Sequence, residues 1–184
     1  MSSIMIGAGQ ELGKFQHKDG LVHYGVQFEK QRLLLEKHRY KVWQVAQMAS
    51  YSVEKFTVLL DLELHVIQGH IDALKEQGLV FESRDILSTS FRTKHIAITK
   101  GYIELKNDGE FELTEFLGAP PVSLPLITAT VWRLANPLFS LESLVENLVQ
   151  VMDMPKVDIE LMLSEAIIFL VSNGFMAIDR LPEA

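Results

Sequence analysis

The hexapeptide Val42-Trp43-Gln44-Val45-Ala46-Gln47 returns in the second half of the chain as Val131-Trp132-Arg133-Leu134-Ala135-Asn136, and the two copies hold the only two tryptophans. In each half of the chain an Asp-Gly pair precedes the hexapeptide, and a serine and then a glycine follow it. These positions are Asp19-Gly20, Ser52 and Gly78 in the first half, and Asp108-Gly109, Ser140 and Gly174 in the second. An internal repeat of this length predicts two similar modules, 1–92 and 93–184.

Each copy begins with strand-like residues and continues with helical spacing. In the first, strands are predicted over 21–28 and 32–35 after the Asp19-Gly20 turn, and helices over about 36–49, 52–60 and 64–77. In the second, strands over 97–105 and 111–117 flank a turn at 107–109, and helices are predicted near 127–136, 140–151 and 157–173. The predicted fold class is therefore α+β: two tandem modules, each a small antiparallel sheet followed by three helices.

The second copy is eight residues longer between its serine and its closing glycine. We expect a longer turn at 152–156 to absorb part of this difference. Its third helix is apolar nearly all round, which predicts burial on more than one side, against the first module or another subunit. Trp43 and Trp132 are interpreted as core anchors of their modules, each with its N–H directed at a carbonyl group.

Charge separates the two modules. Residues 1–92 hold eleven Lys/Arg and eleven Asp/Glu, whereas 93–184 hold six and thirteen, which accounts for the whole net charge of −7. An acidic surface repels a phosphate backbone. Any contact with DNA is therefore expected through the first module only, while the acidic module suits a basic peptide or protein surface.

Enzyme and cofactor chemistry find no support in the sequence. The chain has no cysteine, and its six histidines form no metal-ligating pair of the usual spacing. The glycines at 7, 9 and 13 precede a strand-like stretch, whereas a dinucleotide-binding loop requires a helix there. We expect no enzyme activity, no metal and no cofactor. With neither a signal peptide nor a membrane span, a cytoplasmic protein is predicted.

Residues 60–80 resemble the turn and third helix of winged-helix regulators. This resemblance implies an alternative function in which the third helix of the first module reads DNA. A Ser/Thr-rich loop at 88–90 would then carry basic residues to the backbone. The candidate DNA-binding residues are His65, Gln68, Arg84, Arg92 and Lys94.

Residues 129–176 carry a second resemblance, through Trp132, Leu144, Phe169, Leu170 and Gly174. This pattern of strands, a Val-Trp helix, a serine cap and a closing Asn-Gly-Phe is similar to the pyrroloquinoline-quinone biosynthesis D protein family and related leader-peptide recognition domains. The resemblance implies that a peptide adds as a strand beside the third helix. In the first module the candidate peptide-binding residues are Arg32, Leu33, Leu35, Val66, Gln68, His70 and Ala73.

Two functions follow from these observations. The first is a non-enzymatic adaptor that binds a peptide or protein partner, such as a precursor leader peptide. The alternative is a winged-helix transcription regulator whose acidic second module serves dimerisation, so that a homodimer forms. The charge difference between the modules favours the adaptor.

Overall fold

A computed structural model describes residues 4–49, 51–106, 110–114 and 120–181. The chain is an α+β protein with small antiparallel sheets, and it divides into two compact units. The first unit contains the residues up to Asp85, and the second runs Ile86–Leu181. Residues 86–92, which the sequence analysis assigned to the first module, therefore belong to the second unit. In the part of the chain that the structure describes, no helix is long and apolar enough to cross a membrane.

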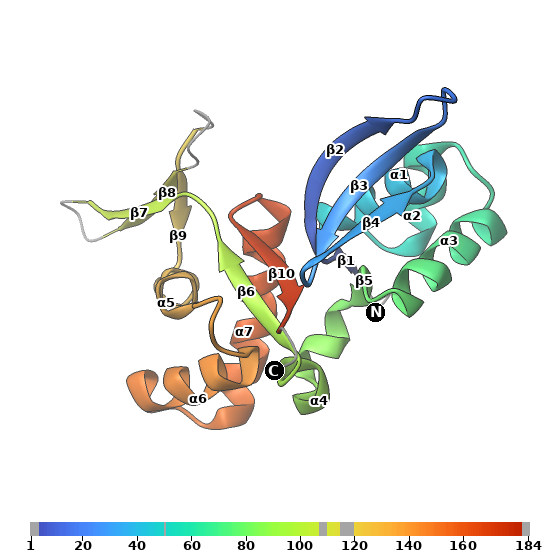
Figure 1. The fold of residues 1–184 in the computed structure, drawn as a ribbon. Coiled ribbons are helices and arrows are strands. Elements are labelled where there is room, and N and C mark those ends of the chain that lie inside the picture. Colours follow the sequence, from blue (N-terminus) through green and yellow to red (C-terminus); the bar gives the residue numbers. More distant parts are fainter. Residues whose placement is uncertain (1–3, 50, 107–109, 115–119, 182–184) are drawn as a thin grey trace. The chain divides into compact units, whose positions relative to one another are not determined.

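The first unit contains two antiparallel sheets and three helices (Figure 1). Strands β2, β3 and β4 form one sheet, and β1 pairs with β5 in the other. The bounds in chain order are β1 (Met5–Gly7), β2 (Gln10–Gln16), β3 (Val22–Phe28), β4 (Gln31–Leu35), α1 (Lys37–Gln47), α2 (Val53–Leu60), α3 (Leu64–Glu76) and β5 (Val80–Glu82). The Tyr24 ring of β3 stacks on Tyr40 of α1, with ring centroids 4.4 Å apart, which attaches the three-stranded sheet to α1.

A short 3-10 helix, η1 (Ser83–Leu87), spans the boundary between the units, and the second unit then begins with α4 (Thr89–Arg92). Strands β7, β8 and β9 form a three-stranded sheet, and β6 pairs with β10. The bounds are β6 (His95–Thr99), β7 (Tyr102–Leu105), β8 (Phe111–Thr114), β9 (Val122–Leu124), α5 (Leu126–Leu134), α6 (Leu141–Met152), α7 (Lys156–Ser172) and β10 (Met176–Arg180). The predicted loop at 88–90 is wrong, because these residues form the cap and start of α4.

The elements of the two units follow the same order. Each has one strand, a three-stranded sheet, three helices and a closing strand that pairs with the first. The second helix ends in both units at an aspartate in the left-handed conformation, Asp61 and Asp153, each with φ of 51°. The third helix ends in both units at a glycine with positive φ, Gly78 and Gly174. The residue after each glycine donates to the carbonyl five residues earlier, as in a Schellman motif.

The eight extra residues of the second copy lie in its helices. The second helix has 8 residues in the first unit and 12 in the second, and the third helix has 13 and 17. The connections between these helices, residues 61–63 and 153–155, are equal in length. The predicted longer turn at 152–156 is therefore wrong, since each helix is instead longer by about one turn.

Tryptophan burial differs between the units. Trp43 is 2% exposed and its Nε1–H donates to the Ala8 carbonyl at 2.8 Å, which confirms the predicted core anchor. Trp132 is only half-buried, and its Nε1–H donates to the Phe175 carbonyl at 3.3 Å. The two indoles thus hold different segments, the loop after β1 in one unit and the residue before β10 in the other.

Some predicted strands differ from the observed ones. The single strand expected over 97–105 is two strands, β6 and β7, separated where Gly101 adopts a φ of 83°. The closing strands β5 and β10 were not predicted, because an apolar stretch after a helix-ending glycine has too few residues to show alternation. The predicted turn at 107–109 and the end of the strand over 111–117 lie outside the described residues.

Candidate functional site

Strand β4 lies at an edge of the first unit's three-stranded sheet. Among the residues that the structure describes, its one neighbour is β3, with Tyr24 opposite Leu35, Val26 opposite Leu33 and Phe28 opposite Gln31. The outer side of an edge strand presents backbone N–H and C=O groups that can pair with another extended chain. β4 therefore offers the physical basis for strand addition.

The side chains of β4 alternate between the two faces of the sheet, and this alternation divides the predicted peptide-binding residues. Leu33 and Leu35 share the face of Tyr24 and Val26, which packs on α1. Leu33 is half-buried, whereas Leu35 is 2% exposed and belongs to the core. Of the predicted leucines, only Leu33 is thus accessible on the helix side.

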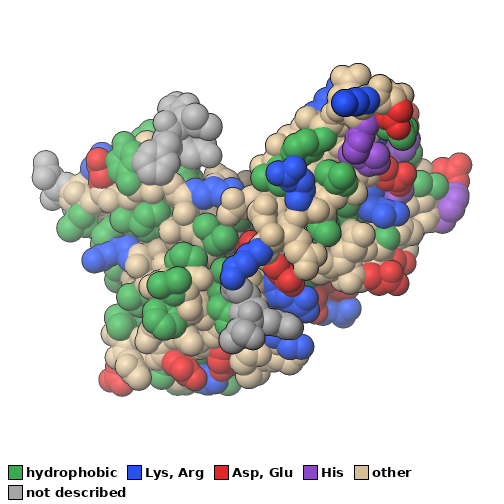
Figure 2. All heavy atoms as spheres, in the orientation of Figure 1, with side chains coloured by type: hydrophobic (Ala, Val, Ile, Leu, Met, Phe, Trp, Pro, Cys, Tyr) green, Lys and Arg blue, Asp and Glu red, His purple; other side chains and the backbone are tan. Residues whose placement is uncertain are grey.

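Arg32 points to the opposite face of the sheet. Its guanidinium lies over the Phe15 ring, 5.0 Å from the centroid, and Phe15 in turn covers Gly25 of β3. Figure 2 shows hydrophobic side chains together with a basic one over β2 to β4. Because successive side chains of a strand point to opposite faces, Arg32 and Leu33 would contact a strand added to β4 from different faces of the sheet.

Two contacts link α3 to the residues that flank β4. Before β4, the Phe28 ring lies 3.1 Å from where a Cβ on Gly78 would stand, just after α3. After β4, Oε1 of Glu36 lies 3.8 Å from Nδ1 of His70, in the middle of α3. Gly78, just after α3, thus lies near the start of β4, and His70 lies near the residue that follows β4.

One stripe of α3 is half-buried. Val66, His70 and Ala73 occupy positions i, i+4 and i+7 and are all partly exposed, whereas Ile67, Ile71 and Leu74 are fully buried. The name β4–α3 surface is used below for Leu33, Val66, His70 and Ala73. Gln68 lies outside this surface, since it is exposed and its amide donates to Asp72 at 2.8 Å.

The basic residues proposed for DNA contact do not form a patch. Arg92 has no exposed surface, so it cannot reach a phosphate, which corrects its placement on an exposed loop. Arg84 pairs with Glu82 at 2.7 Å, and His65 lies 3.2 Å from Glu63. Lys94 is exposed, but it stands in the second unit. The negative charge beside Arg84, His65 and Gln68 opposes phosphate binding.

The buried Arg92 organises a charged cluster inside the second unit. Its Nε and Nη2 donate to Glu142 and Glu160, each at 2.6 Å, and its Nη1 donates to the Ile86 and Leu87 carbonyls. Lys156 also donates to Glu142 at 2.6 Å. Burial acts to raise the pKa of Glu142, but the hydrogen bonds from Lys156 and Arg92 outweigh it and lower the pKa. No local sequence signal reveals this cluster, because its members are far apart in the chain.

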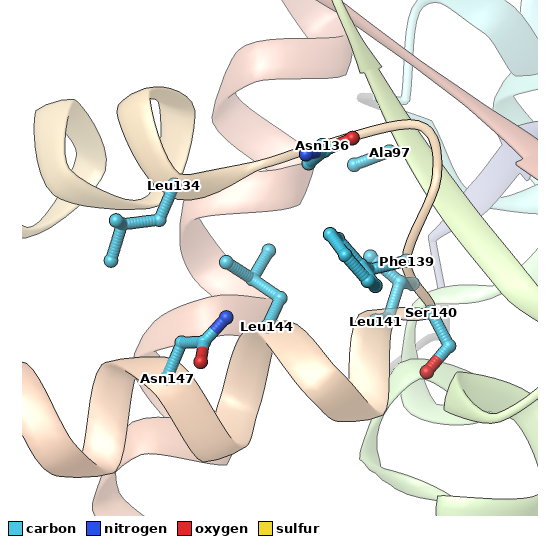
Figure 3. A pocket seen from close by; sticks show the side chains of 8 residues that line it. All are labelled: Ala97, Leu134, Asn136, Phe139, Ser140, Leu141, Leu144 and Asn147. Atoms are coloured by element: carbon cyan, nitrogen blue, oxygen red, sulfur yellow. The ribbon is translucent and has the colours of Figure 1, made fainter.

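A shallow hollow in the second unit has an apolar lining (Figure 3). Leu134, Phe139, Leu141 and Leu144 converge on it from α5, the loop that follows and α6, while the polar groups come from Asn136, Ser140 and Asn147. Phe139 is itself largely exposed. With neither an acid nor a base in its lining, the hollow suits an apolar group and no proton-transfer chemistry.

The fold and the site define an α+β protein of two units, one of which has an open sheet edge at β4. Within the described ranges, no group of three or more His, Asp or Glu residues could hold a metal ion. Comparisons with known protein families, with curated proteins and with solved structures found no match.

Proposed function

We propose that the protein is a non-enzymatic adaptor of the cytoplasm, built from two winged-helix-like modules that arose by duplication. In this proposal an extended segment of a peptide or protein partner adds as a strand to β4 and packs against α3. The observation that carries the proposal is the open outer side of β4, with His70 of α3 near Glu36, the residue that follows the strand.

Two independent features support this mode of binding. Main-chain hydrogen bonds to an edge strand provide affinity without requiring a particular sequence, and side-chain contacts on one face add specificity. The resemblance to leader-peptide recognition domains implies the same arrangement, a strand beside the third helix. A precursor leader peptide is therefore the partner class that we propose.

The test is selection of a displayed library of random twelve-residue peptides on the full chain. We expect enriched peptides with alternating apolar residues, and we expect their binding to slow amide hydrogen exchange in β4. An Ala73→Arg substitution places a bulky charge on the β4–α3 surface and should abolish enrichment. Gln68→Arg introduces the same charge on the exposed side of α3 and should leave the enrichment of peptides unchanged.

Three outcomes would count against the proposal. Failure to enrich any peptide would remove its basis, and so would enrichment insensitive to Ala73→Arg in a protein with unchanged thermal unfolding. If the protein instead retained a labelled DNA duplex at low salt, and Lys94→Ala abolished this retention, the alternative function as a transcription regulator would be supported. Homodimerisation through β4, visible by ultracentrifugation, would identify a second copy as the occupant.

A further inference from the structure

The hairpin that joins β3 to β4 determines which backbone groups of β4 are free. Two residues, Glu29 and Lys30, connect the strands, so that Phe28 and Gln31 pair directly beside the turn. In a two-residue hairpin this closing pair is a hydrogen-bonded one. Hydrogen-bonded and non-hydrogen-bonded pairs alternate along an antiparallel ladder. The residues of β4 therefore bond to β3 at every second position, starting from Gln31.

This alternation leaves two residues of β4 with backbone groups that face outward. Leu33 and Leu35 are the bonded positions that follow the turn. Arg32 and Leu34 lie between the bonded positions, so their N–H and C=O groups point away from β3. Both residues are exposed, and β4 is the outer strand of its sheet among the described residues (Figure 1). A strand added to β4 would thus bond to Arg32 and Leu34.

An apolar row crosses the face of this sheet that lies opposite α1, and it ends at the open edge. Gly25 of β3 pairs directly with Leu34. A Cβ on Gly25 would collide with Cε2 of Phe15 and lie 3.2 Å from Cβ of Leu12, so these two side chains of β2 cover the glycine. Leu34 itself is 45% exposed. The next position in the row belongs to a strand added beside Leu34, where cross-strand pairing favours another apolar side chain.

The charged side chain on the same face is directed elsewhere. The guanidinium of Arg32 lies over the Phe15 ring of β2, 5.0 Å from the centroid. Because β2 and the open edge are on opposite sides of β3, the Arg32 side chain extends across the sheet, away from an added strand. Leu34 therefore provides the contact on this outer face, and the half-buried Leu33 provides the contact on the helix side.

We infer that the segment bound at β4 presents two consecutive bulky apolar residues, the first opposite Leu34 on the outer face and the second opposite Leu33 on the helix side. The inference rests on the proposed function. The pairs within this sheet are antiparallel, and a segment that extends the sheet in the same way runs antiparallel to β4, which sets the order of the two residues. The first apolar residue and the residue opposite Arg32 then exchange backbone hydrogen bonds with β4.

The first part of the experiment maps the bound segment. Selection of the random twelve-residue library on the full chain should enrich two adjacent apolar residues, in addition to the alternating ones on the helix side. Synthetic copies of an enriched peptide then carry one backbone N-methyl group at a time. Methylation of the first apolar residue should weaken binding by about tenfold, because it removes a hydrogen bond to Leu34. Methylation of the second should change binding by less than about twofold, since the N–H opposite Leu33 points away from β4.

The variant Leu34→Pro tests the same edge from the side of the protein. Proline lacks the N–H group, but the N–H of Leu34 makes no bond to β3, and edge strands tolerate proline where the N–H faces solvent. Leu34→Pro should weaken the peptide by about tenfold and leave thermal unfolding near that of the wild type. Leu34→Ala is the matched control, because it keeps the N–H: the methylation pattern should persist, and the preference for an apolar first residue should be lost. Arg32→Pro, at the other outward position, should weaken binding similarly and serves if Leu34→Pro does not fold.

The outcomes separate this inference from the adaptor proposal. Enriched peptides with apolar residues only at alternate positions would overturn the inference and leave the adaptor standing. Sensitivity to methylation at the second apolar residue instead of the first would do the same, and so would unchanged binding to both proline variants by peptides that Ala73→Arg still excludes. Enrichment of no peptide would defeat both proposals together.

Discussion

The Nε–H of Arg92 donates a 2.6 Å hydrogen bond to Oε2 of Glu142, and the two side chains are only 1% and 10% exposed. This ion pair joins α4 to α6 in the second unit. With Glu160 and two backbone carbonyls also bound, every part of the guanidinium has an acceptor. An arginine satisfied in this way is a structural group, and its removal takes a hydrogen-bond donor from both Glu142 and Glu160.

Replacing Arg92 with alanine should therefore destabilise the protein severely. We expect a loss of about 3–5 kcal/mol in the free energy of unfolding, because the buried Glu142 keeps only Lys156 as a cationic partner and Glu160 loses its contact with Arg92. Urea unfolding followed by circular dichroism measures this loss. Arg84→Ala is the matched control, since the 74% exposed Arg84 pairs with Glu82 at the surface and should cost less than about 1 kcal/mol. Equal losses in the two variants would contradict the structural role.

The partial burial of His70 predicts a pH effect on stability. Its pKa in the folded protein is lower than the ordinary value, so the unfolded chain binds a proton at a higher pH than the folded one. The free energy of unfolding should therefore decline as pH falls below about 6.5. Urea unfolding between pH 7.5 and 5.5 measures this decline. The free energy of unfolding of His70→Gln should fall less over this range than that of the wild type. His65→Gln, at a 76% exposed side chain, should follow the wild-type profile.

The left-handed aspartates that end α2 and α6 predict opposite effects of two small substitutions. A side chain with a Cβ is strained at a φ of 51°, and alanine lacks the polar group that makes aspartate tolerable there. Asp61→Ala should lower the free energy of unfolding by about 1 kcal/mol. Asp61→Gly should leave it unchanged or raise it by less than about 1 kcal/mol. At Asp153 we likewise expect the glycine variant to be more stable than the alanine variant. Thermal unfolding distinguishes the variants, and an alanine more stable than the glycine would contradict the assigned conformation.

The two tryptophans should differ in their contribution to stability. Trp43→Phe removes a buried N–H donor from the Ala8 carbonyl and leaves a small void, so a loss of about 1–3 kcal/mol is expected. Trp132→Phe should cost less, since that side chain is half-exposed and its hydrogen bond is longer at 3.3 Å. Urea unfolding of both single variants gives the comparison. A larger loss at Trp132 would be inconsistent with the observed burial.

Local signals were sufficient to predict the three longer helices of each unit within a few residues, although α4 was predicted as a loop. Trp43 and the capping serine, aspartate and glycine positions act on the backbone close to themselves, so their effects can be read from the sequence. The strand predicted over 32–35 corresponds to β4 (Gln31–Leu35). What could not be foreseen was how those residues divide between the two faces, which depends on pairing with β3.

Long-range contacts explain the remaining differences. Arg92 looked like a surface residue, because the carboxylates that bury it come from helices far along the chain. The contact between Glu36 and His70 depends equally on where β4 and α3 bring these two residues. Sequence periodicity reports which face of a helix is apolar, but it does not report which charges meet across the fold.

The four residues added to each of α6 and α7 have a geometric consequence for how the units could diverge. Four residues advance an α-helix by about 400°, which is within about 40° of a full rotation, and lengthen it by about 6 Å. An insertion of this size changes the reach of a helix but hardly its angular phase. Asp153 can therefore end α6 in the same conformation as Asp61 ends α2, with an equally short connection to the next helix. Insertions of two residues would instead have rotated every following side chain to the far side, so length could vary here only in whole-turn steps.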